Sequence, residues 1–575
     1  MLRPRAAALP RLALIAGLLA SAAALPARAD LAGPYLAARA ASAANDYAAA
    51  VTYYDRLLLN APEDLDAQEG ALMTHVALGD FDRAAALADV MIGAKDPSQI
   101  AVLVALAQDA KSGDFAKGVA LLDGGADGGQ LVSGLYRAWA LVGQGQMAEA
   151  TKAFDALAKE KGLIGFASYH KALALAMVGD YEGADEIFSG KLADLLHGTR
   201  RGVLAHVQIL SQLERDPDAV KLLDSAFGSG LDPELKALRE GLVAGETLPF
   251  TVIGSATDGV AEIFYAVGQA LNSDAPSPFA LLHARLATWL RPDHVEAVLL
   301  TAAILETEQQ YDLAIDAYAQ VKPESPAFHA AELGRAEAMV AAGRSDAAIE
   351  VLEKLSRTHP DLPGVWTSLG DNLRREERFK EAAEAYDKAI ALMGEPKPAD
   401  WFVYYARGIA EERSDQWAKA EPDFREALKL SPDQPSVLNY LGYSYVEKKQ
   451  NLDEALGMIE RAVAARPDAG YILDSLGWAF YRLGRYDEAV AQMEKAVELE
   501  PAEPLLNDHL GDVYWAVGRK REAEFQWRRA LNLGPGEAGE LDLDRVRHKL
   551  EFGLDQVLKD EGAPPLHPAQ ADAAE

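Results

Sequence analysis

Residues 470–501 read GYILDSLGWAFYRLGRYDEAVAQMEKAVELEP, and residues 504–535 read PLLNDHLGDVYWAVGRKREAEFQWRRALNLGP. Both stretches carry a Leu-Gly pair, then a Gly, then Ala followed by a large residue and a second Ala, and finally Pro. Small residues at Gly477 and Ala489 suit two helices that cross closely. A proline such as Pro501 ends the second helix, because it lacks the amide donor and clashes with the preceding turn. The pattern predicts two consecutive helical hairpins.

The pattern has the period of about 34 residues that is typical of tetratricopeptide repeats. Three further clear copies begin at Trp401, Pro363 and Pro435, the last with one extra residue between its helices. Weaker copies continue towards the amino terminus and bring the total to about fourteen, where about three suffice for a stable stack. We therefore predict an all-α tetratricopeptide-repeat (TPR) superhelical solenoid.

One segment does not fit the repeat. Leu248–Gly254 combines β-branched residues with Pro and Gly, which predicts an extended connector that divides the solenoid into two arms. Near the other end, apolar residues recur at helical spacing from about Leu541 to Leu558, as expected of one helix that caps the stack. The predicted order is a signal peptide (1–29), a degenerate repeat array (30–240), the connector (241–260), a second array (261–537), the capping helix (538–560) and a disordered tail (561–575).

The amino terminus has the features of a secretory signal peptide. Three arginines precede an apolar run over residues 12–24, and Ala27-Arg28-Ala29 supplies the small residues of a cleavage site. We predict cleavage before Asp30 and a periplasmic location. The chain contains no cysteine, so it has no disulfide and no thioether-linked lipid, and it is not expected to be a lipoprotein. No later stretch predicts a transmembrane segment.

The formal net charge of −32 argues against binding to nucleic acid or to an anionic membrane. The sequence has no H-E-x-x-H, G-x-S-x-G or Walker A motif, and we predict no enzyme activity, no cofactor and no metal. Asp293-His294-Val295-Glu296 has metal-ligand side chains, but ligands must converge in space. An enzyme with an unrecognised site would instead show polar groups converging in a closed pocket near residues 241–260.

The first helix of each repeat lines the concave face, where positions two, five, nine and twelve point into a groove. Aromatic residues there can anchor a protein partner, and Asn or Asp side chains can hold a peptide backbone. Trp515 and Tyr481 are as compatible with packing between repeats as with binding, whereas Trp478 and Tyr443 are the more accessible. The predicted protein-binding residues are Asn439, Tyr443, Tyr471, Asp474, Trp478, Tyr481, Asp508, Asp512 and Trp515.

Asn439–Tyr443, Asp453–Ala455, Leu473–Trp478 and His509–Asp512, followed by Trp515, resemble the carboxyl-terminal repeats of bacterial envelope tetratricopeptide proteins. Some of these are outer-membrane lipoprotein adaptors that bring substrates to periplasmic carboxyl-terminal processing proteases. The resemblance covers about residues 261–537. It implies an envelope scaffold or protease adaptor, here without the lipid anchor because no cysteine is present.

The first functional hypothesis is a periplasmic scaffold or adaptor that binds partner proteins along its groove, among them a processing protease and its substrates. The alternative is an assembly factor for an envelope polysaccharide or for the outer membrane. That alternative predicts association with a synthase or an outer-membrane pore instead of a protease. The sequence does not identify the partner, the oligomeric state or the flexibility between the arms.

Overall fold

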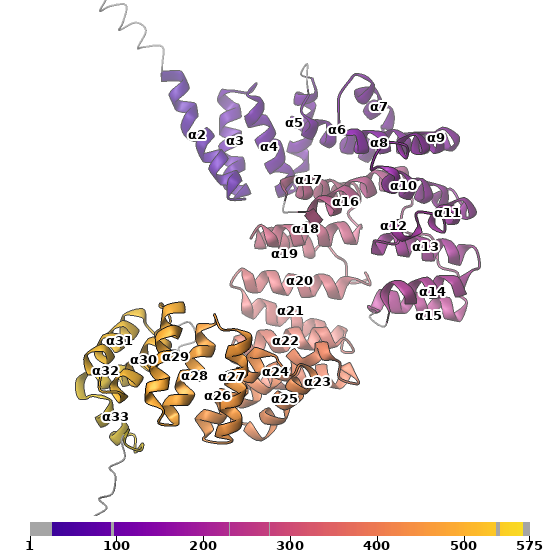
Figure 1. The fold of residues 1–575 in the computed structure, drawn as a ribbon. Helices are drawn as coiled ribbons and strands as arrows, with labels where there is room; N and C mark the ends of the chain where they lie inside the picture. Colours follow the sequence, from indigo (N-terminus) through magenta and orange to yellow (C-terminus); the bar gives the residue numbers. More distant parts are fainter. Residues whose placement is uncertain (1–25, 94–96, 229–230, 275–276, 536–540, 567–575) are drawn as a thin grey trace, which may run out of the picture. The chain divides into compact units, whose positions relative to one another are not determined.

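A computed structural model describes residues 26–93, 97–228, 231–274, 277–535 and 541–566. All regular secondary structure in these residues is helical (Figure 1). The chain divides into two compact units, with the boundary between Leu355 and Ser356. Each unit is a stack of helical hairpins.

The helices of the first unit, the last of which reaches into the second, are α2 (Pro26–Ala43), α3 (Tyr47–Asn60), α4 (Leu65–Leu78), α5 (Phe81–Ile92), α6 (Gln99–Ser112), α7 (Phe115–Asp123), α8 (Gln130–Gly143), α9 (Met147–Leu157), α10 (Ile164–Met177), α11 (Tyr181–Phe188), α12 (Ala193–Leu196), α13 (Arg200–Gln212), α14 (Asp216–Phe227), α15 (Pro233–Ala244), α16 (Ala256–Asp274), α17 (Pro278–Leu290), α18 (Val295–Thr307), α19 (Tyr311–Tyr318), α20 (Phe328–Ala341) and α21 (Ser345–Thr358).

The helices of the second unit are α22 (Pro363–Arg375), α23 (Phe379–Met393), the 3₁₀ helix η1 (Pro398–Asp400), α24 (Trp401–Glu412), α25 (Trp417–Leu430), α26 (Pro435–Lys448), α27 (Leu452–Ala465), α28 (Gly470–Arg482), α29 (Tyr486–Leu499), α30 (Pro504–Ala516), α31 (Lys520–Leu533), α32 (Leu543–Phe552) and α33 (Leu554–Asp560).

In chain order, the helices of the described residues group into fourteen consecutive pairs, from α2–α3 to α30–α31, with α12, α15, η1, α32 and α33 outside the pairs. The predicted all-α repeat fold and the predicted number of repeats are confirmed. The tight turns follow from local chemistry. α4 ends at Gly79, whose φ of +77° closes the helix, and the next residue, Asp80, accepts the Arg83 amide at the start of α5.

The crossing inside the last two hairpins depends on a glycine that faces a large side chain. A Cβ atom on Gly511 would lie 2.4 Å from the Trp527 ring, and one on Gly477 would lie 2.8 Å from Met493. Trp527 and Ala489 are completely buried. The predicted close approach of the paired helices at these glycines is confirmed, and packing of this density leaves no room for a side chain.

The boundary between the units differs from the prediction. Residues 246–255 are non-helical, so the connector exists, but helices cover both ends of the predicted span 241–260. It does not separate two arms, because α16 packs on α6, α8 and α10, and α17 packs on α4 and α6 (Figure 1). Val260 and Phe264 of α16 are completely buried in the same core as Trp139 of α8. The connector therefore returns the chain to the first array, and the chain divides about a hundred residues later.

The predicted capping helix is broken into α32 and α33 at Gly553, which has a φ of +83°. The two helices cover the end of the stack, and Val546 and Leu554 are completely buried. The segment predicted to be a disordered tail begins with placed residues. Leu566 is buried, and its carbonyl accepts a hydrogen bond from Tyr486 Oη at 2.6 Å. Residues 567–575 lie outside the described part of the chain.

Most of the predicted signal peptide, residues 1–25, also lies outside the described residues, and α2 runs through the predicted cleavage site before Asp30. Among the helices that the structure describes, none has the length and apolar character needed to cross a membrane.

Candidate protein-binding faces

The candidate site is the first-helix face, defined here as positions two, five, nine and twelve of the first helix in each hairpin. In the second unit these first helices are α22, α24, α26, α28 and α30. A Gly at position eight of each of these helices fixes the register, so equivalent side chains repeat from hairpin to hairpin. Burial of this face increases towards the carboxyl-terminal end.

At α30 the predicted binding residues are engaged by the chain itself. Lys549 of α32 is completely buried and places Nζ 2.7 Å from both Asp508 Oδ2 and Asp512 Oδ1. Trp515 donates from Nε1 to Asp555 at 3.0 Å. The prediction that Asp508 and Asp512 lie open in a groove is therefore wrong. The reason is that the cap covers the first-helix face of the last hairpin as well as the end of the stack.

At α28 the predicted residues form a stacked cluster. His509 Nδ1 lies 3.0 Å from Asp474 Oδ2, and both side chains are buried. Burial lowers the pKa of His509, but Asp474 outweighs this effect and raises the pKa above its ordinary value. Trp478 stacks on His509 with ring centres 4.1 Å apart, and on Tyr481 at 4.8 Å. Trp478 is 9% exposed, so most of its surface serves the packing of this hairpin on the next.

The open part of the face lies from α24 to the start of α28. Tyr471 is 40% exposed, and Tyr443 is partly exposed. Asn439 is buried, and its Oδ1 makes no hydrogen bond within the described residues. The residues at the same position of the next two helices do have partners, His509 for Asp474 and Lys549 for Asp508. Asn439 thus has a buried acceptor without a hydrogen bond within the described residues, at position five of the same face that carries Tyr443 and Tyr471.

Sequence reasoning missed the aromatic side chains of α24. Phe402 at position two is 38% exposed, and Tyr405 at position five is partly buried. The Tyr405 ring lies 5.9 Å from Tyr440 and 6.1 Å from Trp401. The register that gave Asn439 and Tyr443 also gives Phe402 and Tyr405 when it is applied to the copy from Trp401. These residues extend the aromatic face by one hairpin.

In the first unit the equivalent face is filled by the chain itself. The extended segment after α15 lies along α13, whose side chains bind its backbone. Gln208 accepts from the Thr251 amide at 2.8 Å, and Gln212 donates to the Leu248 carbonyl at 2.6 Å. Ser211 Oγ accepts from the Leu248 amide at 3.0 Å. Together with the packing of α16 and α17 on α4 to α10, this segment occupies much of the first-helix face of the first unit.

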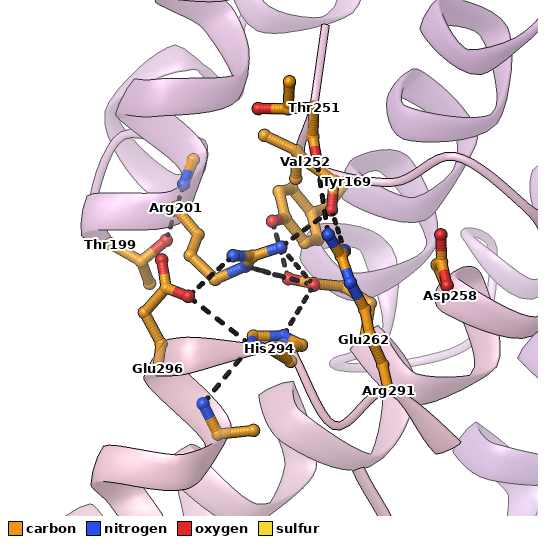
Figure 2. Close-up of polar contacts among 12 residues, drawn as sticks. Tyr169, Thr199, Arg201, Thr251, Val252, Asp258, Glu262, Arg291, His294 and Glu296 are labelled. Carbon is orange, nitrogen blue, oxygen red and sulfur yellow. Dashed lines mark hydrogen bonds and ion pairs between the residues drawn. The ribbon is translucent and has the colours of Figure 1, made fainter. Parts of the chain in front are cut away.

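A buried ion cluster fixes α16 in this position (Figure 2). Arg201 of α13 binds Glu262 of α16 through Nη2 at 2.7 Å and Glu296 of α18 through Nη1 at 3.0 Å. Tyr169 of α10 donates to Glu262 at 2.9 Å. Burial acts to raise the pKa of Glu262, but Arg201 and His294 outweigh it and hold that pKa well below its usual range. Sequence reasoning missed Arg201 and Glu262, which lie on repeats too degenerate to assign a register.

His294 belongs to this cluster and not to a metal site. Its Nδ1 accepts from the Ala297 amide at 3.2 Å, so a neutral ring carries its proton on Nε2, which lies 3.2 Å from Glu262. In the part of the chain that the structure describes, no group of three or more His, Asp or Glu side chains could hold a metal ion. The polar groups near residues 241–260 do converge, and they pair with one another.

Comparisons with known proteins agree with this architecture. Two family models described as tetratricopeptide repeat match the chain, one at residues 35–100, 405–470 and 445–504 and the other at residues 290–370. These segments lie in both units. The chain therefore contains segments in both units that are similar to tetratricopeptide repeats.

Two curated relatives share part of the chain. The TPR repeat-containing protein PA4667 of Pseudomonas aeruginosa is 31% identical over 181 residues, which is 31% of this chain and 30% of that protein. Human tetratricopeptide repeat protein 13 is 28% identical over 193 residues, 33% of this chain and 22% of that protein. The match thus spans less than a third of either relative.

Similar solved structures include the Cut9–Hcn1 complex, at 14% identity and a TM-score of 0.38. The match covers 90% of this chain and 95% of the matched chain in that complex. The crystal structure of YrrB, described as a TPR protein with an unusual peptide-binding site, is 19% identical with a TM-score of 0.27. It covers 36% of this chain and 100% of the YrrB chain.

Proposed function

We propose that the protein is a non-catalytic interaction scaffold whose second unit binds a segment of a partner protein on the first-helix face between α24 and α28. Tetratricopeptide repeats are helical hairpins whose stacked first helices offer such a surface. The first unit fills much of its own face, and the cap fills the face of α30. The open aromatic surface that remains includes Phe402, Tyr443 and Tyr471.

The observation that carries the proposal is Asn439. A buried amide oxygen without a hydrogen bond costs about 1–3 kcal/mol, and native proteins rarely keep such an atom unless a ligand or water satisfies it. Asn439 Oδ1 is such an atom, and its neighbours in the repeat series have partners. An N–H group of a bound peptide backbone would supply the missing donor, while exposed aromatic rings such as Tyr471 provide contact area at low entropic cost.

In the cell, we propose, the protein is exported, cleaved before Asp30, and acts in the periplasm as an adaptor that presents substrates to a processing protease. The signal-like amino terminus and the resemblance to envelope adaptors support this role. The alternative, an assembly factor for envelope polysaccharide or outer-membrane biogenesis, rests on the same surface and differs in the partner.

The test is affinity capture of the tagged mature protein from its own periplasm, with the bound proteins identified by mass spectrometry. Asn439→Ala and Tyr471→Ala alter the open face. Phe525→Ala, which removes a 62% exposed aromatic side chain from the second helix α31, is the matched control. A partner recovered by the wild type and by Phe525→Ala, but lost with both face variants, supports the binding face. Equal recovery by all four proteins contradicts it.

The identity of the captured protein separates the two cellular roles. A captured processing protease supports the adaptor, and the purified scaffold should then accelerate cleavage of the co-captured substrate. A polymer synthase or an outer-membrane pore supports the assembly factor and contradicts the adaptor.

A further inference from the structure

Arg285 of α17 is a buried arginine that makes no ion pair within the described residues. The residue is 7% exposed. Its Nε donates a hydrogen bond to the carbonyl of Ala77, near the end of α4, at 3.0 Å. Within the described residues the terminal nitrogens Nη1 and Nη2 have neither a hydrogen bond nor an ion pair. Burial lowers the pKa of Arg285 to about 10. The four N–H donors of Nη1 and Nη2 are thus not used by the described residues, although the residue as a whole is buried.

The comparison with Arg201 shows how unusual this is in the same unit. Arg201 is equally buried and is held by two glutamates and a backbone carbonyl. The chain has 88 acidic and 56 basic residues, so carboxylates are abundant. The helix-capping contact with Ala77 explains the position of Arg285 Nε, since a cation stabilises a helix carboxyl end. The contact with Ala77 does not involve Nη1 and Nη2, the two nitrogens at the outer edge of the guanidinium.

Arg285 lines a cavity of about 350 Å³ between α4, α5, α6, α17 and α19. Lys111 of α6 lines the same cavity, donates to the Trp289 carbonyl at 2.6 Å, and lies 5.7 Å from the centre of the Trp289 ring. Phe81 stacks on Trp289 with ring centres 4.8 Å apart. Leu78 and Leu313 add apolar walls. Two cations and a pair of aromatic rings therefore surround one hollow.

The acidic groups nearby limit the charge of a ligand. Asp316, an exposed residue, also lines the cavity, and Glu308 accepts a hydrogen bond from Tyr47 at 2.7 Å. Neither makes an ion pair with Arg285, but both lower the positive potential around it. A singly charged carboxylate fits this balance better than a phosphate dianion. The planar fork of an arginine also matches the two oxygens of a carboxylate.

We propose that this cavity is a binding site for an organic carboxylate. Arg285 holds both carboxylate oxygens through Nη1 and Nη2, Lys111 adds a second positive charge, and Phe81 and Trp289 contact the apolar part of the ligand. The carboxylate belongs either to a free small molecule or to the carboxyl terminus of a peptide.

The experiment is titration calorimetry of the full chain with sodium phenylacetate, phenylacetamide, N-acetylphenylalanine and inorganic phosphate. Lys111→Met removes an exposed cation, and Arg285→Lys keeps the charge but loses the fork. Arg83→Met is the matched control, because Arg83 is an exposed arginine on α5 that pairs with Asp55 and does not line the cavity. Melting temperatures establish that each variant is folded.

We expect phenylacetate to bind at one site and each cavity variant to weaken it about tenfold or more, the range of a hydrogen bond to a charged group. Arg83→Met should bind like the wild type, and phenylacetamide should not bind. Tighter binding of N-acetylphenylalanine than of phenylacetate assigns the carboxylate to a peptide terminus, and equal binding assigns it to a free acid. Equal binding of the amide, unchanged affinity in Lys111→Met, or a preference for phosphate would overturn the proposal.

Discussion

The ammonium nitrogen of Lys549 lies 2.7 Å from Asp512 Oδ1, and the lysine side chain is completely buried. The same nitrogen lies 2.7 Å from Asp508 Oδ2, and Arg545 approaches Asp512 to 3.7 Å. These contacts tie α32 to the first helix of the last hairpin. They also place the cap on positions that would otherwise extend the binding face, so the open face ends before α30.

Replacing Lys549 with Met should destabilise the protein by about 3–5 kcal/mol, because removal of one partner from a buried ion pair leaves an uncompensated charge. Two carboxylates depend on this lysine, and Asp508 Oδ1 already lacks a hydrogen bond. Urea denaturation of the full chain, followed by circular dichroism, measures the loss.

The control for that experiment is Lys559→Met, which removes an exposed lysine from α33 and should change stability by no more than about 0.5 kcal/mol. Equal stability of the two variants would show that the buried pair with Asp508 and Asp512 does not hold the cap.

Gly511→Ala should destabilise the second unit by about 1–3 kcal/mol, because the added methyl group would lie 2.4 Å from Trp527 Nε1 and overpack the hairpin. Gly457→Ala on α27 is a matched control, since a Cβ atom there meets nothing within 4 Å. That change should stabilise its helix by up to about 1 kcal/mol through helix propensity alone. Thermal unfolding of both variants checks the opposite signs, and a loss of stability in both would refute the packing argument.

The contrast between Gly511 and α16 shows what the sequence could predict. The repeat period assigns Gly511 and Trp527 to facing positions, because the contact lies within one hairpin and depends on local spacing. The same reasoning predicts a helix after the connector, but it does not predict which helices this one packs against. Val260 and Phe264 are apolar at helical spacing whether they face the next repeat or, as observed, α8. Burial is encoded locally, and the choice of partner is not.

The candidate binding residues divide in the same way. Register alone places Asn439, Tyr443 and Tyr471 on the first-helix face, and these side chains lie where the face is open. It also places Asp508 and Asp512 there, but a helix some forty residues away pairs with both. A lysine in an amphipathic helix pattern, such as Lys549, is usually exposed, so the sequence does not indicate this pairing. Only the three-dimensional contact reveals its role.

Substitution of Trp478 should mainly lower the stability of the protein, whereas substitution of Tyr471 should mainly weaken partner binding. Trp478→Ala removes a ring that stacks on His509 and is 9% exposed, so it should cost about 3–5 kcal/mol. Tyr471→Ala removes a 40% exposed ring and should cost no more than about 1 kcal/mol while it weakens partner capture. Denaturant unfolding measures both. If Trp478→Ala is as stable as the wild type, the ring is not part of the packed core, and its role would have to be sought in binding.

Glu411 should make the stability of the second unit depend on pH near neutrality. Burial raises the pKa of Glu411 to about 7, and the nearby Asp423 carboxylate adds to the increase. Its Oε2 has no hydrogen-bond partner, while Arg407 is bound to Asp423 and Asp387. Because the folded state binds the proton more tightly than the unfolded state, the stabilising contribution is complete below about pH 4.5. It is lost as the pH rises through 7.

Glu411→Gln keeps the shape of the protonated side chain but cannot ionise. It should match the wild type at pH 5 and exceed its stability by up to about 3 kcal/mol at pH 8, the free energy equivalent of the pKa shift. Urea denaturation at a series of pH values measures the difference between the two proteins, which cancels the titration of groups they share. Glu376→Gln, at an exposed glutamate of the turn after α22, should follow the wild type at every pH. A constant difference between Glu411→Gln and the wild type would mean that Glu411 is ionised in the folded protein throughout this range.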